Sequence, residues 1–202
     1  MPYPIVIAMM RGKKRKIVIN FQKSNMCRKL LFIFLIALSA QDSLAEESAF
    51  MKKINNFAER GYVDAQYNLA RIYSNGESVD QNFELAAYWF LKAAEQGNKD
   101  AQYQLAKMFE NGLGVDFDSK EAFRWYTLSA EQGNIEAQYS LGLAYRLGIG
   151  VDQNFTQSLK WYKSSASRGH SGAQYNLNLL YQEGLATQKD ISDAIKWYRC
   201  GR

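Results

Sequence analysis

Side chains able to carry out catalysis are scarce in this sequence. Its single histidine is His170, and its only cysteines are Cys27 and Cys200. A nucleophile needs a base within reach, and a zinc site needs three or four suitable ligands. Neither arrangement is available, and the Ser-x-x-Lys spacing of one class of acylating serine enzymes does not occur. We therefore expect no catalytic residue, no metal and no cofactor, and we interpret His170 as a solvated turn residue.

Three acidic residues, Asp64, Asp100 and Glu136, recur at a spacing of 36 residues and are the remaining candidates for acid–base chemistry. Each stands at the start of a segment with helical periodicity, where the helix dipole favours a carboxylate by about 0.3 to 1 kcal/mol. We interpret them as helix-start residues. Any function then has to come from the surfaces of the helices that they begin.

Those elements belong to an internal repeat with a period of 36 residues. The tripeptide Ala-Gln-Tyr is followed by a leucine and then an aromatic residue at spacings of four, which marks one face of a helix. A glycine that supplies a left-handed C-terminal residue ends this first helix. The four copies of the tripeptide begin at Ala65, Ala101, Ala137 and Ala173, and the four glycines are Gly76, Gly112, Gly148 and Gly184.

A second helix follows in each repeat and begins at an Asx residue suited to capping a helix N-terminus. It carries small residues and a Trp-Tyr or Trp-Phe pair, which we expect to fill the space between successive helix pairs. The capping residues are Asn82, Asp118, Asn154 and Asp190, and the aromatic pairs begin at Trp89, Trp125, Trp161 and Trp197.

This organisation predicts an all-α fold, an α/α superhelical solenoid of helix-turn-helix repeats. A lone helix in residues 46–62 keeps the register of a second helix, but Lys53 replaces the tryptophan, as suits an N-terminal cap. The expected repeats are 63–98, 99–134, 135–170 and a truncated 171–202. Truncation leaves an apolar C-terminal face, which is either a frayed end or a surface for self-association.

Residues 1–45 are predicted to be a signal peptide. Arg28 and Lys29 precede an uncharged apolar run of 11 residues, too short for the roughly 20 residues of a membrane-spanning helix. Small residues place the cleavage site after Ala45, and translation could start at Met26. We expect a periplasmic or secreted protein that meets the membrane only during export. An uncleaved anchor is the alternative.

The net charge of +5 does not indicate nucleic-acid binding, because eight of the 25 basic residues precede residue 30. From Glu46 onward there are 17 basic and 19 acidic residues, so the repeat region carries about −2. Such a region lacks the basic footprint of a nucleic-acid-binding surface. With Cys27 in the signal segment, the single remaining Cys200 also excludes an internal disulfide.

The repeat resembles the Sel1-like repeat, a relative of the tetratricopeptide repeat. The strongest local match runs from Ala137 to Gly169 and includes Leu141-Gly142 and Trp161-Tyr162. Ala70, Ala106 and Asn178 depart from it at the Gly142 position, and Ala186-Thr187 replaces Gly-Val in the fourth repeat. The resemblance implies a non-catalytic adaptor that binds a protein or peptide. Two alternatives are a β-lactam-hydrolysing enzyme, as in cysteine-rich relatives whose disulfides this chain lacks, and a self-assembling structural module.

In tetratricopeptide-like solenoids the first helix of each repeat lines the concave side, which makes its outward residues the candidate partner-binding site. Four tyrosines in register form a stripe there, and the flanking column changes from basic to apolar. The predicted residues are Tyr67, Arg71, Tyr103, Lys107, Tyr139, Leu143, Tyr175 and Leu179. Tyrosine is enriched in interfaces because it combines a large apolar area with a polar tip. Equally, the tyrosines could pack against the first helix of the adjacent repeat and serve stability alone.

Overall fold

The computed structural model describes residues 48–185, and this part of the chain contains helices and no strands. Residues 48–59 are helical. They are followed by α2 (Val63–Asn75), α3 (Phe83–Glu95), α4 (Lys99–Asn111), α5 (Ser119–Glu131), α6 (Ile135–Leu147), α7 (Phe155–Ala166) and α8 (Ser171–Gln182). The all-α prediction is confirmed. The predicted signal segment, Asp190, Trp197 and Cys200 lie outside the described residues.

Helix ends lie where the capping residues predict them. The side chains of Asn82, Asp118 and Asn154 accept a hydrogen bond from a backbone N–H in the first turn of α3, α5 and α7. At the other end of the first helices, Gly76 and Gly112 adopt φ of +71° and +63°, which places them in the left-handed region. Local sequence therefore sets the length of every helix pair.

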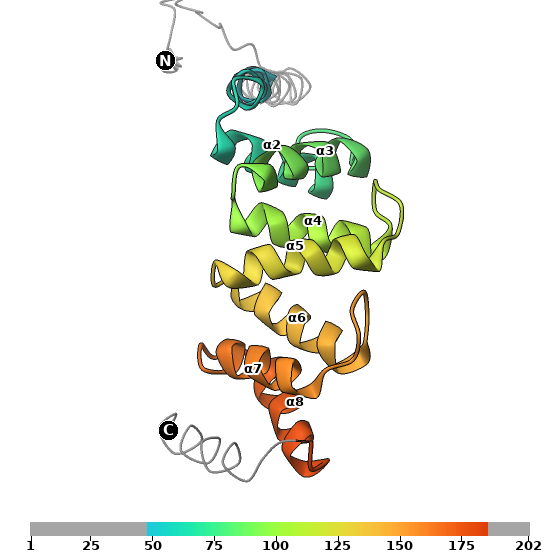
Figure 1. The fold of residues 1–202 in the computed structure, drawn as a ribbon. Coiled ribbons are helices and arrows are strands. Elements are labelled where there is room, and N and C mark those ends of the chain that lie inside the picture. The colour runs from blue at the N-terminus through green and yellow to red at the C-terminus, as the bar shows by residue number, and fades with distance from the viewer. Residues whose placement is uncertain (1–47, 186–202) are drawn as a thin grey trace, which may run out of the picture. The chain divides into compact units, whose positions relative to one another are not determined.

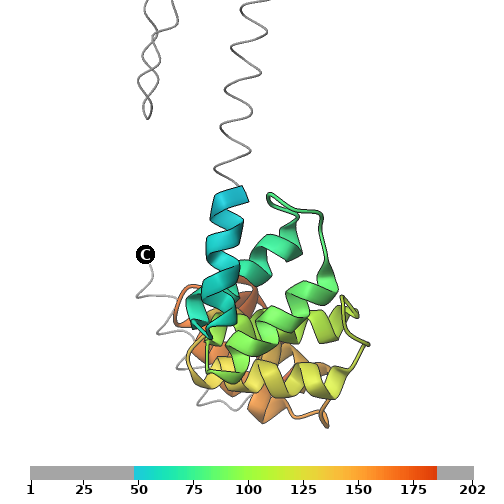
Figure 2. The same ribbon diagram turned by 90° about the horizontal axis from the view of Figure 1, so that it is seen from above.

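The helices pack in chain order, each against the one before and the one after it. Figure 1 shows them following one another from α2 to α8, and Figure 2, turned by 90°, shows successive helices overlying one another. No helix within residues 48–185 is long and apolar enough to cross a membrane. This consecutive packing is the solenoid arrangement that the repeat predicts.

The second residue of each aromatic pair within residues 48–185 lies in the core, whereas Trp89 and Trp161 are partly buried against it. Phe90, Trp125, Tyr126 and Tyr162 are all buried, with at most 5% of their surface exposed. Small residues face them: Gly142 lies so close to the Tyr162 ring that an added Cβ would stand 2.6 Å from Cδ1. The small residues let the helices approach closely, and the aromatic rings fill the space that remains between them.

The helix of residues 48–59 packs on α2 in the way that a second helix packs on the next first helix. Ile54 and Ala58 are buried in one apolar cluster with Leu69 and Ile72. Lys53, at the position where later repeats have tryptophan, is exposed. A charged side chain is compatible with this helix because the position faces solvent.

Loops between the two helices of a repeat contact the preceding repeat through glycine. Gly114 and Gly150 have φ of +69° and +70°, and a Cβ on either would overlap the carbonyl of Phe83 or Ser119, the first residues of α3 and α5. Only a residue without a side chain permits this contact of backbone with backbone. These two loops therefore also fix the spacing between repeats.

Replacing Gly150 with alanine should lower the free energy of unfolding by about 3 kcal/mol. A positive φ costs a non-glycine residue about 1–2 kcal/mol, and the overlap with Ser119 adds about 1–3 kcal/mol as backbone moves away. Urea unfolding of the full chain measures the change. Gly97→Ala is the control, because Gly97 has φ of +87° but open space around its Cβ position. Equal losses in the two variants would contradict the close contact.

Candidate interaction surface on the first helices

The eight predicted partner-binding residues lie on the first helices α2, α4, α6 and α8, two on each, and we call them the tyrosine surface. Arg71 and Lys107 are exposed, and Tyr175 has 65% of its surface exposed. The other five, Tyr67, Tyr103, Tyr139, Leu143 and Leu179, are partly buried. The surface is therefore accessible along its length, but its tyrosines are not alike.

Three tyrosines of this surface are held by aromatic residues of the second helix in their own repeat. The ring centroids of Tyr67 and Phe90 are 5.8 Å apart, and Tyr103 lies 5.9 Å from Tyr126. Tyr139 repeats the contact with Tyr162 at 6.0 Å. The second helix therefore supplies a supporting ring in each of these three repeats, and Tyr139 also contacts the adjacent first helix α8.

Hydroxyl groups of two of these tyrosines face the acidic residue that begins the next first helix. Burial raises the pKa of Tyr67, and the carboxylate of Asp100 raises it further. The pKa of Tyr103 is raised by burial and then by Glu136 and Glu110. Both hydroxyls therefore stay protonated at neutral pH and remain able to donate a hydrogen bond to a partner.

The basic residues of the surface lie over the tyrosine rings. The Arg71 guanidinium carbon is 6.0 Å from the Tyr67 ring centroid, and the Lys107 ammonium is 5.7 Å from that of Tyr103. Attraction between a cation and a ring at this distance and exposure is worth about 0.5–1 kcal/mol. Within the described residues neither side chain forms an ion pair, so both charges face solvent. The first two repeats consequently present cations on an aromatic support.

The last two repeats present a different surface. Leu143 and Leu179 take the positions of Arg71 and Lys107, and both are partly buried. Tyr175 is exposed, and its counterpart ring by the repeat, Tyr198, lies outside the described residues. The side chains at positions 71, 107, 143 and 179 therefore change from basic to apolar along the surface, as expected from the sequence, and all four are at least partly accessible.

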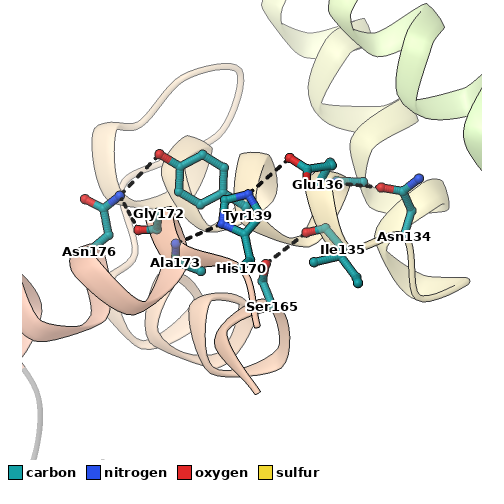
Figure 3. A network of polar contacts seen from close by, with 10 residues as sticks. Asn134, Ile135, Glu136, Tyr139, Ser165, His170, Gly172, Ala173 and Asn176 are labelled. Carbon is teal, nitrogen blue, oxygen red and sulfur yellow. Dashed lines mark hydrogen bonds and ion pairs between the residues drawn. The ribbon is translucent and has the colours of Figure 1, made fainter. Parts of the chain in front are cut away.

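Sequence reasoning missed a polar network at the start of α8, centred on His170 (Figure 3). The imidazole stacks on Tyr139 with ring centroids 4.4 Å apart and an interplanar angle of 22°. Its Nδ1 accepts a hydrogen bond from the Ala173 N–H at 3.0 Å, and its Nε2 lies 3.1 Å from Glu136. Only 14% of the side chain is exposed. The expectation of a solvated turn residue was wrong, because the ring folds back over α6.

The same junction carries a second polar group of contacts. Asn176 donates to the Tyr139 hydroxyl at 3.3 Å, and its own carbonyl accepts from Arg146 at 2.9 Å. Arg146 also forms an ion pair with Glu183 at 3.1 Å. These contacts join α6 to α8 directly.

The described residues contain no group of three or more His, Cys, Asp or Glu side chains placed to hold a metal ion. The shortest contact between titratable side chains joins the Tyr126 hydroxyl to Glu110 at 2.6 Å. Burial, and then this hydrogen bond, raise the pKa of Tyr126. A phenol kept protonated in this way is a structural donor rather than a base.

Stacked helix pairs joined through conserved positions of a 36-residue repeat define a solenoid protein. The sequence profile of the Sel1 repeat matches four consecutive segments, residues 63–98, 99–134, 135–170 and 171–201. The chain belongs to the Sel1 repeat family. Proteins of this family are generally non-catalytic scaffolds that bind other proteins.

Solved structures of bacterial proteins resemble this fold. A protective antigen of uropathogenic Escherichia coli with an SLR fold aligns with a TM-score of 0.69 at 36% identity, over 74% of this chain and 32% of the antigen. The chain thus spans about a third of the antigen's length. A Sel1 repeat protein from Oxalobacter formigenes aligns with a TM-score of 0.59 at 37% identity, over 63% of this chain and 96% of that one. No curated protein gives a significant sequence match.

After Tyr162→Phe, the free energy of unfolding should fall less steeply as the pH rises into the alkaline range. Burial raises the pKa of Tyr162 to about 12, whereas an unfolded tyrosine titrates near 10. Between these values the unfolded chain has lost the proton and the folded chain keeps it, so stability falls by up to about 1.4 kcal/mol per pH unit. Thermal unfolding at pH 9.5 and 11.5 measures the slope. Phe90 at the equivalent position shows that a ring without a hydroxyl is accommodated. Equal slopes in the two proteins would contradict the prediction.

Proposed function

We propose that the protein is an exported, non-catalytic adaptor that binds a protein or peptide partner on the tyrosine surface. The observation that carries the proposal is the exposure of Arg71 and Lys107 over partly buried tyrosine rings. Both cations are accessible while Phe90 and Tyr126 hold the rings beneath them, so that a partner could contact charge and ring together. The family's general role as scaffolds agrees with a binding surface of this kind.

Packing in the core makes this surface suited to binding. Each supporting tyrosine is held against a buried ring of the second helix, so that it loses little conformational freedom when a partner is bound. The basic half favours a partner segment with carboxylates or backbone carbonyls, and the half with Leu143 and Leu179 favours apolar side chains. We therefore expect a partner segment that is polar at one end and apolar at the other.

Photo-cross-linking in cells should locate the partner. A benzophenone amino acid at Lys107 of the full chain should cross-link a partner protein, because this side chain is exposed on α4. The same residue at Lys120, exposed on the second helix α5, should not. Cross-links from both positions, or from Lys120 alone, would exclude the tyrosine surface as the site. A product with twice the chain's mass would instead identify self-association.

Charge reversal tests the energetic role of the cations. Arg71→Glu with Lys107→Glu should weaken the binding of that partner at least about tenfold, since each lost charge-assisted contact is worth about 1.5–3 kcal/mol. Lys120→Glu with Lys160→Glu makes the same change of net charge on second helices and should leave binding unchanged. Circular dichroism verifies that both variants fold. Unaltered binding by the first variant would refute a role for these cations.

Export should release a chain that begins at Glu46. Mass spectrometry of the protein from the periplasmic fraction measures this directly. Ala45→Phe should block processing, because signal cleavage requires a small residue immediately before the cut. A chain that stays in the cytoplasm at its full mass would contradict the export part of the proposal and leave the binding part open to its own test.

A further inference from the structure

His170 caps α8 in a way that requires a neutral imidazole. Its Nδ1 accepts the Ala173 N–H, so this nitrogen cannot itself carry a proton. The proton of the neutral ring must then sit on Nε2, which faces Glu136 at 3.1 Å. The corresponding first helices α4 and α6 are capped by Asn98 and Asn134, whose side-chain oxygens accept at any physiological pH.

Protonation places the two contacts of the ring in conflict. A proton on Nδ1 would point at the Ala173 N–H, and the positive end of the α8 dipole would repel the charged ring. The contact with Glu136 would become a stronger ion pair at the same time. The ring would therefore remain on α6 and release the first turn of α8.

The surroundings contain few other charges that could mask this effect. Glu136 and Tyr139 face the ring from α6, and Arg146 lies further along the same helix. Arg168, in the turn after α7, donates to the carbonyl of Gly133. The first turn of α8 contains no acidic residue to attract a charged imidazole away from Glu136.

We propose that His170 makes the junction between the third repeat and α8 sensitive to pH, so that mild acid uncaps α8 while the earlier repeats stay unchanged. Histidine is the side chain that changes charge between pH 5 and 8. A site exposed to external pH, such as the periplasm, would give the switch a use, but the proposal rests on the cap alone. It holds whether or not the tyrosine surface binds a partner.

Hydrogen exchange of the full chain, carrying a tag without histidine, tests the switch. After correction for intrinsic chemistry, exchange in the first turn of α8 should rise about fivefold from pH 7.5 to pH 5, as expected for loss of a helix cap. The first turns of α4 and α6 are internal references and should not change. Because the chain has one histidine, its imidazole C2–H signal in NMR reports His170 without assignment. The pH midpoint of the change in exchange should coincide with the midpoint of the change in this NMR signal.

Two variants separate the cap from general acid destabilisation. His170→Asn places the cap residue of α4 and α6 in α8 and should abolish the pH dependence while keeping the protection of α8. Glu136→Gln removes the carboxylate that would pair with the charged ring on α6, and should reduce the acid-induced rise of exchange in α8. The proposal is overturned if wild-type protection is equal at both pH values, or if His170→Asn responds to acid as the wild type does.

Discussion

Packing of the first helices α2, α4 and α6 on the preceding helix depends on one buried glutamine in each of them. Its side-chain amide donates to a carbonyl in the last turn of the preceding helix: Gln66 to Ala58, Gln102 to Ala94 and Gln138 to Ala130, each at 3.1 Å. Each of these carbonyls also accepts the backbone N–H of the glycine that ends the helix, Gly61, Gly97 or Gly133. The buried amide itself would cost about 1–3 kcal/mol if it lacked an acceptor. The contact therefore satisfies the glutamine and helps to fix the register of the repeats.

A second glutamine extends this contact in the first two junctions, and the third junction departs from it. Gln96 and Gln132 donate to Gln66 and Gln102 at 2.7 Å. Arg168 occupies the next equivalent position and donates to a backbone carbonyl instead, so that the buried Oε1 of Gln138 has no partner among the described residues. The junction that loses this contact is the one that gains His170, Asn176 and the Arg146–Glu183 ion pair. Polar contacts with α8 thus take over a function that the glutamine pair performs elsewhere.

Local features of the sequence were enough to predict the fold. Asn82 and Gly76 cap helices through their own backbone neighbourhood, and the aromatic positions of the second helix follow from periodicity. The repeat pattern placed His170 at the turn before a first helix, but it did not predict which residues the imidazole contacts. Asn98 and Asn134 at the same turn suggested a solvated residue, yet the longer imidazole reaches Tyr139 and Glu136. One feature of the sequence indicated this contact. His170 follows Glu136 by 34 residues, the same spacing that separates Asn134 from its hydrogen-bond partner Asp100.

The candidate surface illustrates why a repeat can change its partner without losing its fold. A tyrosine such as Tyr103 has one side packed on Tyr126 and the other side accessible, so its replacement would disturb the core and the surface together. The position four residues after each tyrosine is free of that constraint. It is arginine or lysine in two repeats and leucine in the other two. The helices that carry these residues are of the same length or one residue shorter. The recognition that we propose would then reside mainly in that column, since its side chains can vary at little cost to stability. The tyrosines supply a rigid aromatic base that holds them in place.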